Sequence, residues 1–183
     1  MRELALHLLD IAENSISAQA SNITIQVRED RAADRLYMAV IDDGKGMDPE
    51  MVARVIDPFV TSRTTRKVGL GIPLLKAAAE ACNGGLTITS APGVGTTIEV
   101  EFQLSHIDRM PLGSLAETFL SLLIGSPHVH WVFDVQVDQE VFVFDDQPIK
   151  QELDGVPFTE PDVLRFIREY LEEGLRQVHI NQA

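Results

Sequence analysis

Apolar and polar positions change their period along this 183-residue chain, and the changes predict its elements. Residues 2–18 repeat apolar positions at helical spacing, which predicts a first helix with a buried side. Residues 23–27 alternate and residues 36–41 form a near-continuous apolar run, so both predict strands. Helical spacing returns in residues 48–57 and 71–81.

A hairpin follows the helix that is predicted to end near residue 83. Its strands are expected at residues 86–89 and 96–104, and the glycine-containing turn at residues 91–95 joins them. The second strand alternates strongly, which favours an antiparallel sheet covered on one side only. The predicted fold class is therefore α+β, a two-layer α/β sandwich with helices on one face of a mixed, mostly antiparallel sheet.

The last part of the chain continues with a different order of elements. We expect a helix at residues 112–124, strands at 129–137 and 140–147, and a final helix at 160–176. We therefore divide the chain into a domain at residues 1–105 and a C-terminal α-β-β-α extension at residues 106–183. The extension is expected to continue the first sheet, to form a homodimer or to dock a protein partner.

The charge of the chain is strongly acidic, with a formal net charge of −13. Residues 105–183 carry 14 acids and 5 bases, a balance of −9. Nucleic-acid binding needs clustered lysine and arginine, so no nucleic acid is expected as a partner. The acidic surface is interpreted either as a solvated surface or as a site for a basic protein partner.

Cysteine usage and hydropathy narrow the class of protein further. Cys82 is the single cysteine, which excludes an internal disulfide and any multi-cysteine metal site. No signal peptide or apolar run of membrane-spanning length is apparent, so we expect a cytoplasmic protein without a membrane partner. His128 and His130 are expected to share a strand face, but they lack nearby carboxylates in a clear ligand pattern, so no metal is expected there.

The first predicted helix carries an unusual polar stripe. His7, Asp10, Asn14 and Ser17 follow one another at spacings of 3, 4 and 3. Asp, Asn and Ser are poor helix formers, so the stripe indicates more than solvation, although a solvated face remains the alternative. The Asn14 carbonyl is a suitable hard ligand for Mg²⁺, and Asp10 could hold and deprotonate a water.

Asp42 ends the apolar run of the second strand and opens the segment Asp-Asp-Gly-Lys-Gly-Met. A carboxylate at a strand end can accept a hydrogen bond from an exocyclic amine such as adenine N6. Gly44 and Gly46 let the backbone turn sharply and approach a flat ligand. A plain Asp-Gly turn is the alternative.

A polar loop and a second glycine motif follow. Residues 57–67 contain three cations in five residues, Arg63 to Lys67, which suit phosphate oxygens. A solvated loop is the alternative. The Gly69-Leu70-Gly71 motif then opens a helix, whose free backbone amides form an anion site.

These motifs, with the later Gly93-x-Gly95-Thr96 turn, resemble an ATP-binding domain in their order and spacing. It is the domain shared by gyrase-type topoisomerases, heat-shock chaperones, histidine kinases and mismatch-repair ATPases, and the resemblance covers about residues 1–105. It implies that Asn14 ligates Mg²⁺, that Asp42 reads adenine and that Arg63 reaches the γ-phosphate. It also implies that Gly44 and Gly46 floor the base pocket, that Gly69 and Gly71 cradle phosphates and that Thr96 supports the adenine site. The expected ATP-binding residues are Asn14, Asp42, Gly44, Gly46, Met47, Phe59, Arg63, Lys67, Gly69, Leu70, Gly71 and Thr96.

The resemblance also implies a catalytic role for Asp10, at a position where many members of the family have Glu. The sequence begins inside the first helix, so no phospho-accepting histidine hairpin is expected and the chain should not be a complete histidine kinase. Three functions remain open. They are a signalling protein kinase that acts on a separate protein, an ATP-gated binding module without catalysis, and an autonomous ATPase of mismatch-repair type.

Overall fold

A computed structural model describes residues 3–59 and 71–183 of the chain. The described residues form six helices and six strands. In chain order they are α1 (Leu4–Ser17), β1 (Asn22–Asp30), β2 (Arg35–Asp42), α2 (Pro49–Ile56), α3 (Gly71–Ala81), β3 (Gly85–Ala91), β4 (Gly95–Gln103), α4 (Leu115–Gly125), β5 (His130–Val137), β6 (Glu140–Asp145), α5 (Asp146–Leu153) and α6 (Pro161–Gln177).

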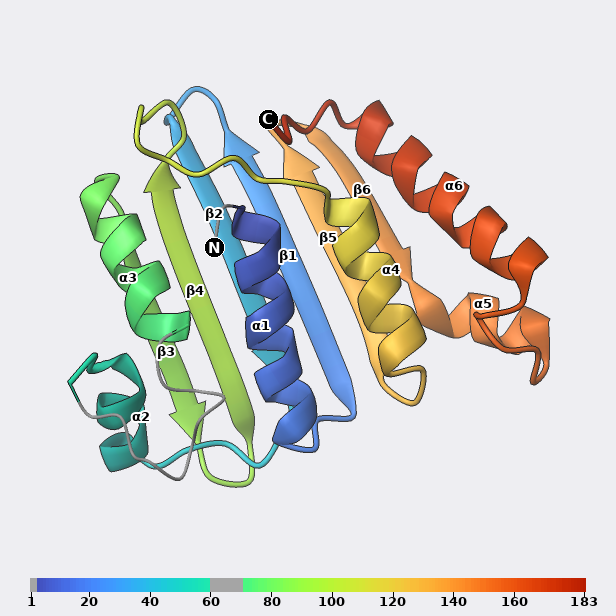
Figure 1. Cartoon of the computed structure of the whole chain (residues 1–183), viewed down its shortest axis with the longest axis horizontal. Helices are drawn as coiled ribbons and strands as arrows, with labels where there is room; N and C mark the ends of the chain where they lie inside the picture. The colour runs from blue at the N-terminus through green and yellow to red at the C-terminus, as the bar shows by residue number, and fades with distance from the viewer. Residues whose placement is uncertain (1–2, 60–70) are drawn as a thin grey trace.

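All six of these strands belong to one sheet, in the order β3-β4-β2-β1-β5-β6 (Figure 1). Four of the five strand pairs are antiparallel, and β1 pairs with β5 in parallel. The predicted mixed, mostly antiparallel sheet is therefore confirmed. Since β5 is hydrogen-bonded directly to β1, residues 1–105 and residues 106–183 share this sheet.

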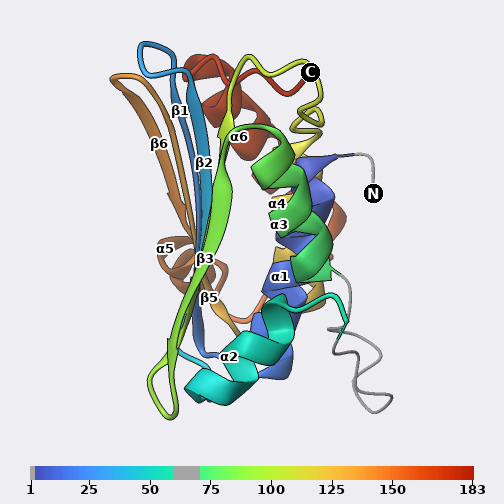
Figure 2. The same cartoon turned by 90° about the vertical axis from the view of Figure 1, so that its left-hand side faces the viewer.

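Helices α1, α3 and α4 pack on one face of the sheet, as Figure 2 shows. The buried positions of β1 and β5 alternate with more exposed ones, because successive side chains of a strand point to opposite faces. In β2 the three consecutive residues Met38 to Val40 are all buried. Ile25, Met38 and Phe133 on the covered face are fully buried, and Leu8 and Leu75 meet them from α1 and α3 with at most 1% exposure. Burial of this apolar surface is the main favourable term that holds the two layers together.

The most apolar of these helices, α4, belongs to the C-terminal part of the chain. Its buried residues include Phe119, Leu122 and Leu123, and it packs between α1 and α6. The Phe119 ring stacks on Phe133 of β5, with ring centroids 4.1 Å apart. Among the described helices, none is both long and apolar enough to cross a membrane.

Side-chain caps set where several helices begin. Asp48 accepts a hydrogen bond from the Met51 amide at the start of α2, and Glu160 accepts from two amides at the start of α6. Both helices have proline in the first turn, where its missing amide proton costs no intrahelical hydrogen bond. The helix expected from residue 112 begins later, at Leu115, because the Ser114 side chain accepts from the Glu117 amide and caps it there.

The structure corrects two predictions for the last hairpin. The strand predicted to reach residue 147 ends at Asp145, which caps the unpredicted helix α5 by accepting from the Gln147 amide. His128 lies in the turn before β5, so it does not share a strand face with His130.

Candidate functional site

The polar stripe of α1 opens onto a cavity of about 650 Å³. His7, Asp10 and Asn14 line this cavity, and Gly71 at the start of α3 lines another wall. Asp10 and Asn14 are half-buried, which leaves their oxygens accessible to a ligand. The helical phase therefore places both predicted oxygen donors in a single cavity, one turn apart.

His7 lies deeper than a polar stripe would predict, with 4% of its surface exposed. Burial lowers the pKa of the His7 imidazole, and the nearby Asp10 carboxylate opposes this change. A lowered pKa keeps His7 neutral at neutral pH, so it adds no positive charge to the cavity.

Asp42 occupies the centre of a hydrogen-bond network at the end of β2. Its Oδ1 accepts from the Gly44 amide at 2.9 Å and from the Thr96 amide at 3.2 Å. Its Oδ2 accepts from the Ser15 hydroxyl at 2.6 Å. Because Ser15 follows Asn14 directly, this contact holds Asp42 beside the segment of α1 that carries the predicted metal ligand, although Asp42 is not among the residues that line the cavity.

The two glycine turns lie against each other at the same end of the sheet. A Cβ on Gly46 would lie 1.9 Å from the Ala91 carbonyl, and one on Gly95 would lie 2.0 Å from the Asp42 carbonyl. Both residues have positive φ, so the backbone is close-packed in conformations that glycine adopts without strain. The Met47 amide donates to Ser90 Oγ at 2.8 Å and fixes the end of the first turn.

The remaining predicted residues fall in different places. Gly44 packs against Ala18 at the end of α1, while Phe59 is 93% exposed at the end of the described N-terminal range. The predictions for Arg63, Lys67, Gly69 and Leu70 lie outside the described residues.

Sequence reasoning missed two contributions to the site. Ser15 lies on the buried side of α1, and a polar residue on that apolar side was the available signal. Sequence reasoning also gave no indication that Ser121 and Gly125 of α4 would line the same cavity as Asp10. That proximity depends on the packing of α4 against α1, which no local pattern encodes.

The donor set of the cavity fits a hard cation. The Asn14 carbonyl and the Asp10 carboxylate are oxygen ligands, which Mg²⁺ prefers, and Mg²⁺ commonly takes only one or two of them from a protein.

The expectation that His130 lacks nearby carboxylates in a ligand pattern is wrong. The β5–β6 hairpin brings Asp145 and Asp146 to this imidazole, away from the α1 cavity. These residues are 15 and 16 positions later in the chain, so their spacing gave no local signal.

Comparison with known proteins gives a family match over residues 2–106. The matching family is described as histidine kinase-, DNA gyrase B- and HSP90-like ATPase. Sensor protein kinase FleS of Pseudomonas aeruginosa is 38% identical over 110 residues, which cover 60% of this chain and 27% of that protein. The non-motile and phage-resistance protein of Caulobacter vibrioides is 33% identical over 111 residues, covering 56% of this chain and 13% of that protein. The matched region is thus less than a third of either relative.

A solved structure supports the fold. The ATPase domain of Aquifex aeolicus MutL, solved with ADP, aligns with a TM-score of 0.54 at 15% identity. The alignment covers 84% of this chain and 68% of that one, so the likeness extends beyond residue 106.

Proposed function

The chain belongs to the family of histidine kinase-, DNA gyrase B- and HSP90-like ATPases, and from this premise we propose that it is a Mg·ATP-dependent signalling phosphotransferase. Its phosphoryl acceptor would be a separate protein. FleS, one of the relatives, is described as a sensor protein kinase, and this supports a signalling role. In this proposal the chain is cytoplasmic, and its ATP-binding domain phosphorylates another protein.

One observation carries the proposal. The α1 helix places Asp10 and Asn14 in one cavity, while the neighbouring Ser15 is bonded to Asp42. A nucleotide whose adenine is read by Asp42 would then have its phosphates near the oxygen donors of α1. The start of α3 at Gly71 would offer backbone amides to those phosphates.

Each residue has a defined role in the proposed reaction. Asp42 would accept a hydrogen bond from adenine N6, with its carboxylate held in place by the amides of Gly44 and Thr96. Asn14 would hold the Mg²⁺, which when bound supplies positive charge to the phosphates. Asp10 would remove the proton from the attacking hydroxyl or water, the role of a general base.

A second candidate is an ATP-gated binding module. It is favoured by the walls of the cavity, because Ser121 and Gly125 of α4 line it together with Asp10. A nucleotide that moved α1 would thereby act on the C-terminal part of the chain. The shorter reach of Asp10, compared with Glu, also favours binding without chemistry.

An autonomous ATPase is the third candidate, and phosphate release separates it from the others. Purified protein is incubated with Mg·[γ-³²P]ATP, alone and with candidate acceptor proteins, and both free phosphate and labelled protein are measured. The phosphotransferase predicts label on an acceptor, and Asp10→Asn should reduce that transfer about 10²–10⁴-fold with ATP affinity retained. Phosphate release without an acceptor would favour the ATPase.

Glu13→Gln is the matched variant, because Glu13 is a second carboxylate of the same helix that lines the cavity but is exposed. If transfer is lost in this variant and kept in Asp10→Asn, the assignment of the base is wrong. If ATP binds and neither transfer nor hydrolysis occurs, the gated module replaces the phosphotransferase.

A further inference from the structure

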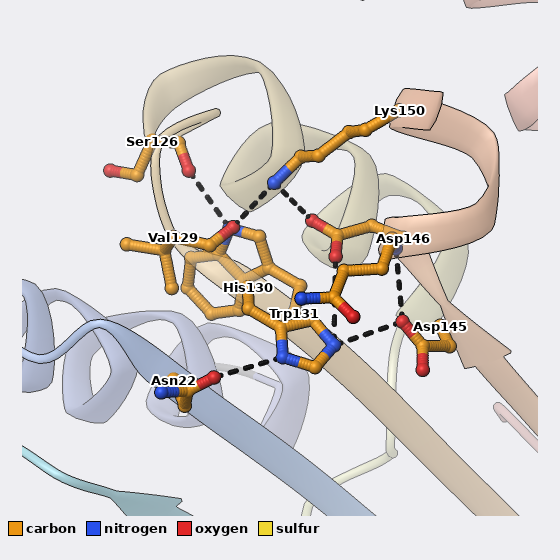
Figure 3. Close-up of polar contacts among 9 residues, drawn as sticks. Asn22, Ser126, Val129, His130, Trp131, Asp145, Asp146 and Lys150 are labelled. Atoms are coloured by element: carbon orange, nitrogen blue, oxygen red, sulfur yellow. Dashed lines mark hydrogen bonds and ion pairs between the residues drawn. The ribbon is translucent and has the colours of Figure 1, made fainter. Parts of the chain in front are cut away.

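A second group of titratable side chains lies where β5 begins and β6 ends. His130, Asp145 and Asp146 each direct one potential ligand atom to a common point, and these atoms lie within 4.8 Å of one another (Figure 3). The group joins three elements, β5, β6 and α5. It is separate from the residues proposed to bind ATP.

The neighbours of His130 determine which nitrogen carries its proton. Asn22 Nδ2 donates to Asp43 Oδ2 at 2.7 Å, which orients the amide so that Asn22 Oδ1 faces His130 Nδ1 at 2.9 Å. A carbonyl oxygen only accepts, so Nδ1 must be the donor. The Asn22 hydrogen bonds lower the pKa of the Asp43 carboxyl, which keeps it an acceptor. Nε2 is then the nitrogen that faces the two carboxylates, and in a neutral imidazole with the proton on Nδ1 it presents a lone pair to them.

The atoms that face Nε2 are themselves acceptors. Asp145 Oδ1 lies 2.9 Å from Nε2, and Asp146 Oδ1 lies 4.0 Å from it. Three electron pairs would repel one another at this point unless a cation lies between them. That cation is either a proton on Nε2 or a metal ion.

The burial of the Asp146 carboxylate is a second reason to expect a cation at this point. The side chain of Asp146 is 0% exposed, and its oxygens accept no hydrogen bond of normal geometry from the described residues. Burial raises the pKa of its carboxyl, while the nearby Lys150 ammonium and Trp131 amide lower it. The Lys150 ammonium lies 2.6 Å from Oδ2 and also donates to the Val129 carbonyl at 2.7 Å, so it compensates one side of the carboxylate. Oδ1 on the other side is directed at His130. A buried carboxylate oxygen without a donor is costly.

We propose that His130 Nε2, Asp145 Oδ1 and Asp146 Oδ1 form a binding site for a divalent transition-metal ion such as Zn²⁺. One imidazole nitrogen and two carboxylate oxygens are a donor set that suits Zn²⁺, whereas Mg²⁺ and Ca²⁺ prefer oxygen alone. Asn22 supports the imidazole from its far nitrogen, as partners of metal-bound histidines do. The side chains of His130 and Asp145 are 24% and 44% exposed, which gives the ion a path from solvent.

Zinc titration of the chelator-treated, metal-free protein tests the site directly. Calorimetry without nucleotide should give one equivalent of Zn²⁺ bound, and Co²⁺ should give visible absorption. His130→Gln and Asp145→Asn should each weaken binding at least 10-fold, and Asn22→Ala about 10–100-fold through the orientation of His130. His128→Gln is the matched control, because His128 is exposed and lies outside the group.

Two results would overturn the proposal. The first is zinc binding that is absent, or that falls equally in His128→Gln. The second is a His130 imidazole that ¹⁵N NMR shows protonated on both nitrogens at neutral pH and unchanged by equimolar zinc, which would make the group an ion-pair network. Because Asp145 is partly exposed, Asp145→Asn separates lost ligation from lost folding, which circular dichroism monitors. ATP binding is measured separately and does not enter this test.

Discussion

At the scale of single residues, the α1 site depends on which side chains face each other across the layers. Asp10 and Asn14 are separated by one helical turn, and the sequence pattern alone predicted their common face. The hydrogen bond between Ser15 and Asp42 could not be predicted in this way. Periodicity identifies the buried side of a helix. It does not identify which residue of another element, here 27 positions later in the sequence, a buried side chain will contact.

His7 gives a pH dependence whose sign follows from burial. Its pKa is lowered in the folded protein from the ordinary value of 6.5, so the unfolded chain binds this proton more readily. The contribution of neutral His7 to stability is therefore complete above pH 6.5 and is lost as pH falls through the lowered pKa.

Urea unfolding near pH 7.5 and pH 5.5 measures this effect. The free energy of unfolding should decrease less between these pH values in His7→Leu than in the wild type. His128→Gln, at an exposed position, should behave as the wild type does. An equal decrease in wild type and His7→Leu would contradict the role of burial.

At the scale of elements, local capping explains what the sequence predicted and what it missed. Glu160 and Pro161 start α6 in a pattern that can be recognised without any tertiary information. Asp145 and Asp146 directly follow the apolar residues 141–144, and the predicted strand ran over them to residue 147, although α5 begins at Asp146. The arrival of His130 beside these residues depends on the pairing of β5 with β6, which is settled by the whole sheet.

The turn at Gly46 should be intolerant of any side chain. Gly46→Ala would place Cβ 1.9 Å from the Ala91 carbonyl at a φ of +71, and we expect a loss of about 2–4 kcal/mol of unfolding free energy. Gly93→Ala is the matched control, because Gly93 has a φ of +76 and open space around its Cβ. It should cost only about 1–2 kcal/mol. Chemical denaturation compares the two, and equal losses would contradict close packing of the turns.

At the scale of the whole molecule, the parallel pairing of β1 with β5 makes one sheet from both parts of the chain. The α+β class and most elements followed from local patterns. The position of β5 beside β1 did not, because it joins strands about a hundred residues apart in sequence. The same long-range packing brings α4 to the cavity of α1.

This shared sheet predicts a single unfolding transition. Trp131, the one tryptophan, is fully buried on β5, so its fluorescence follows the C-terminal part while far-ultraviolet circular dichroism follows all elements. The two denaturation curves should coincide. Phe133→Ala, which removes a ring stacked on Phe119, should lower both midpoints through a loss of about 3–5 kcal/mol. Separate transitions would instead indicate two independent domains.

Calorimetric titration of Mg·ATP into the wild type and Asp42→Asn tests the proposed nucleotide site. Asn keeps an oxygen for the Gly44 and Thr96 amides but removes the charged acceptor for adenine. Hydrogen bonds to charged groups contribute about 1.5–3 kcal/mol, so affinity for ATP should fall roughly 10–100-fold while the fold is retained. Wild-type protein that binds no ATP, or an Asp42→Asn variant that binds it equally well, would contradict the proposed site.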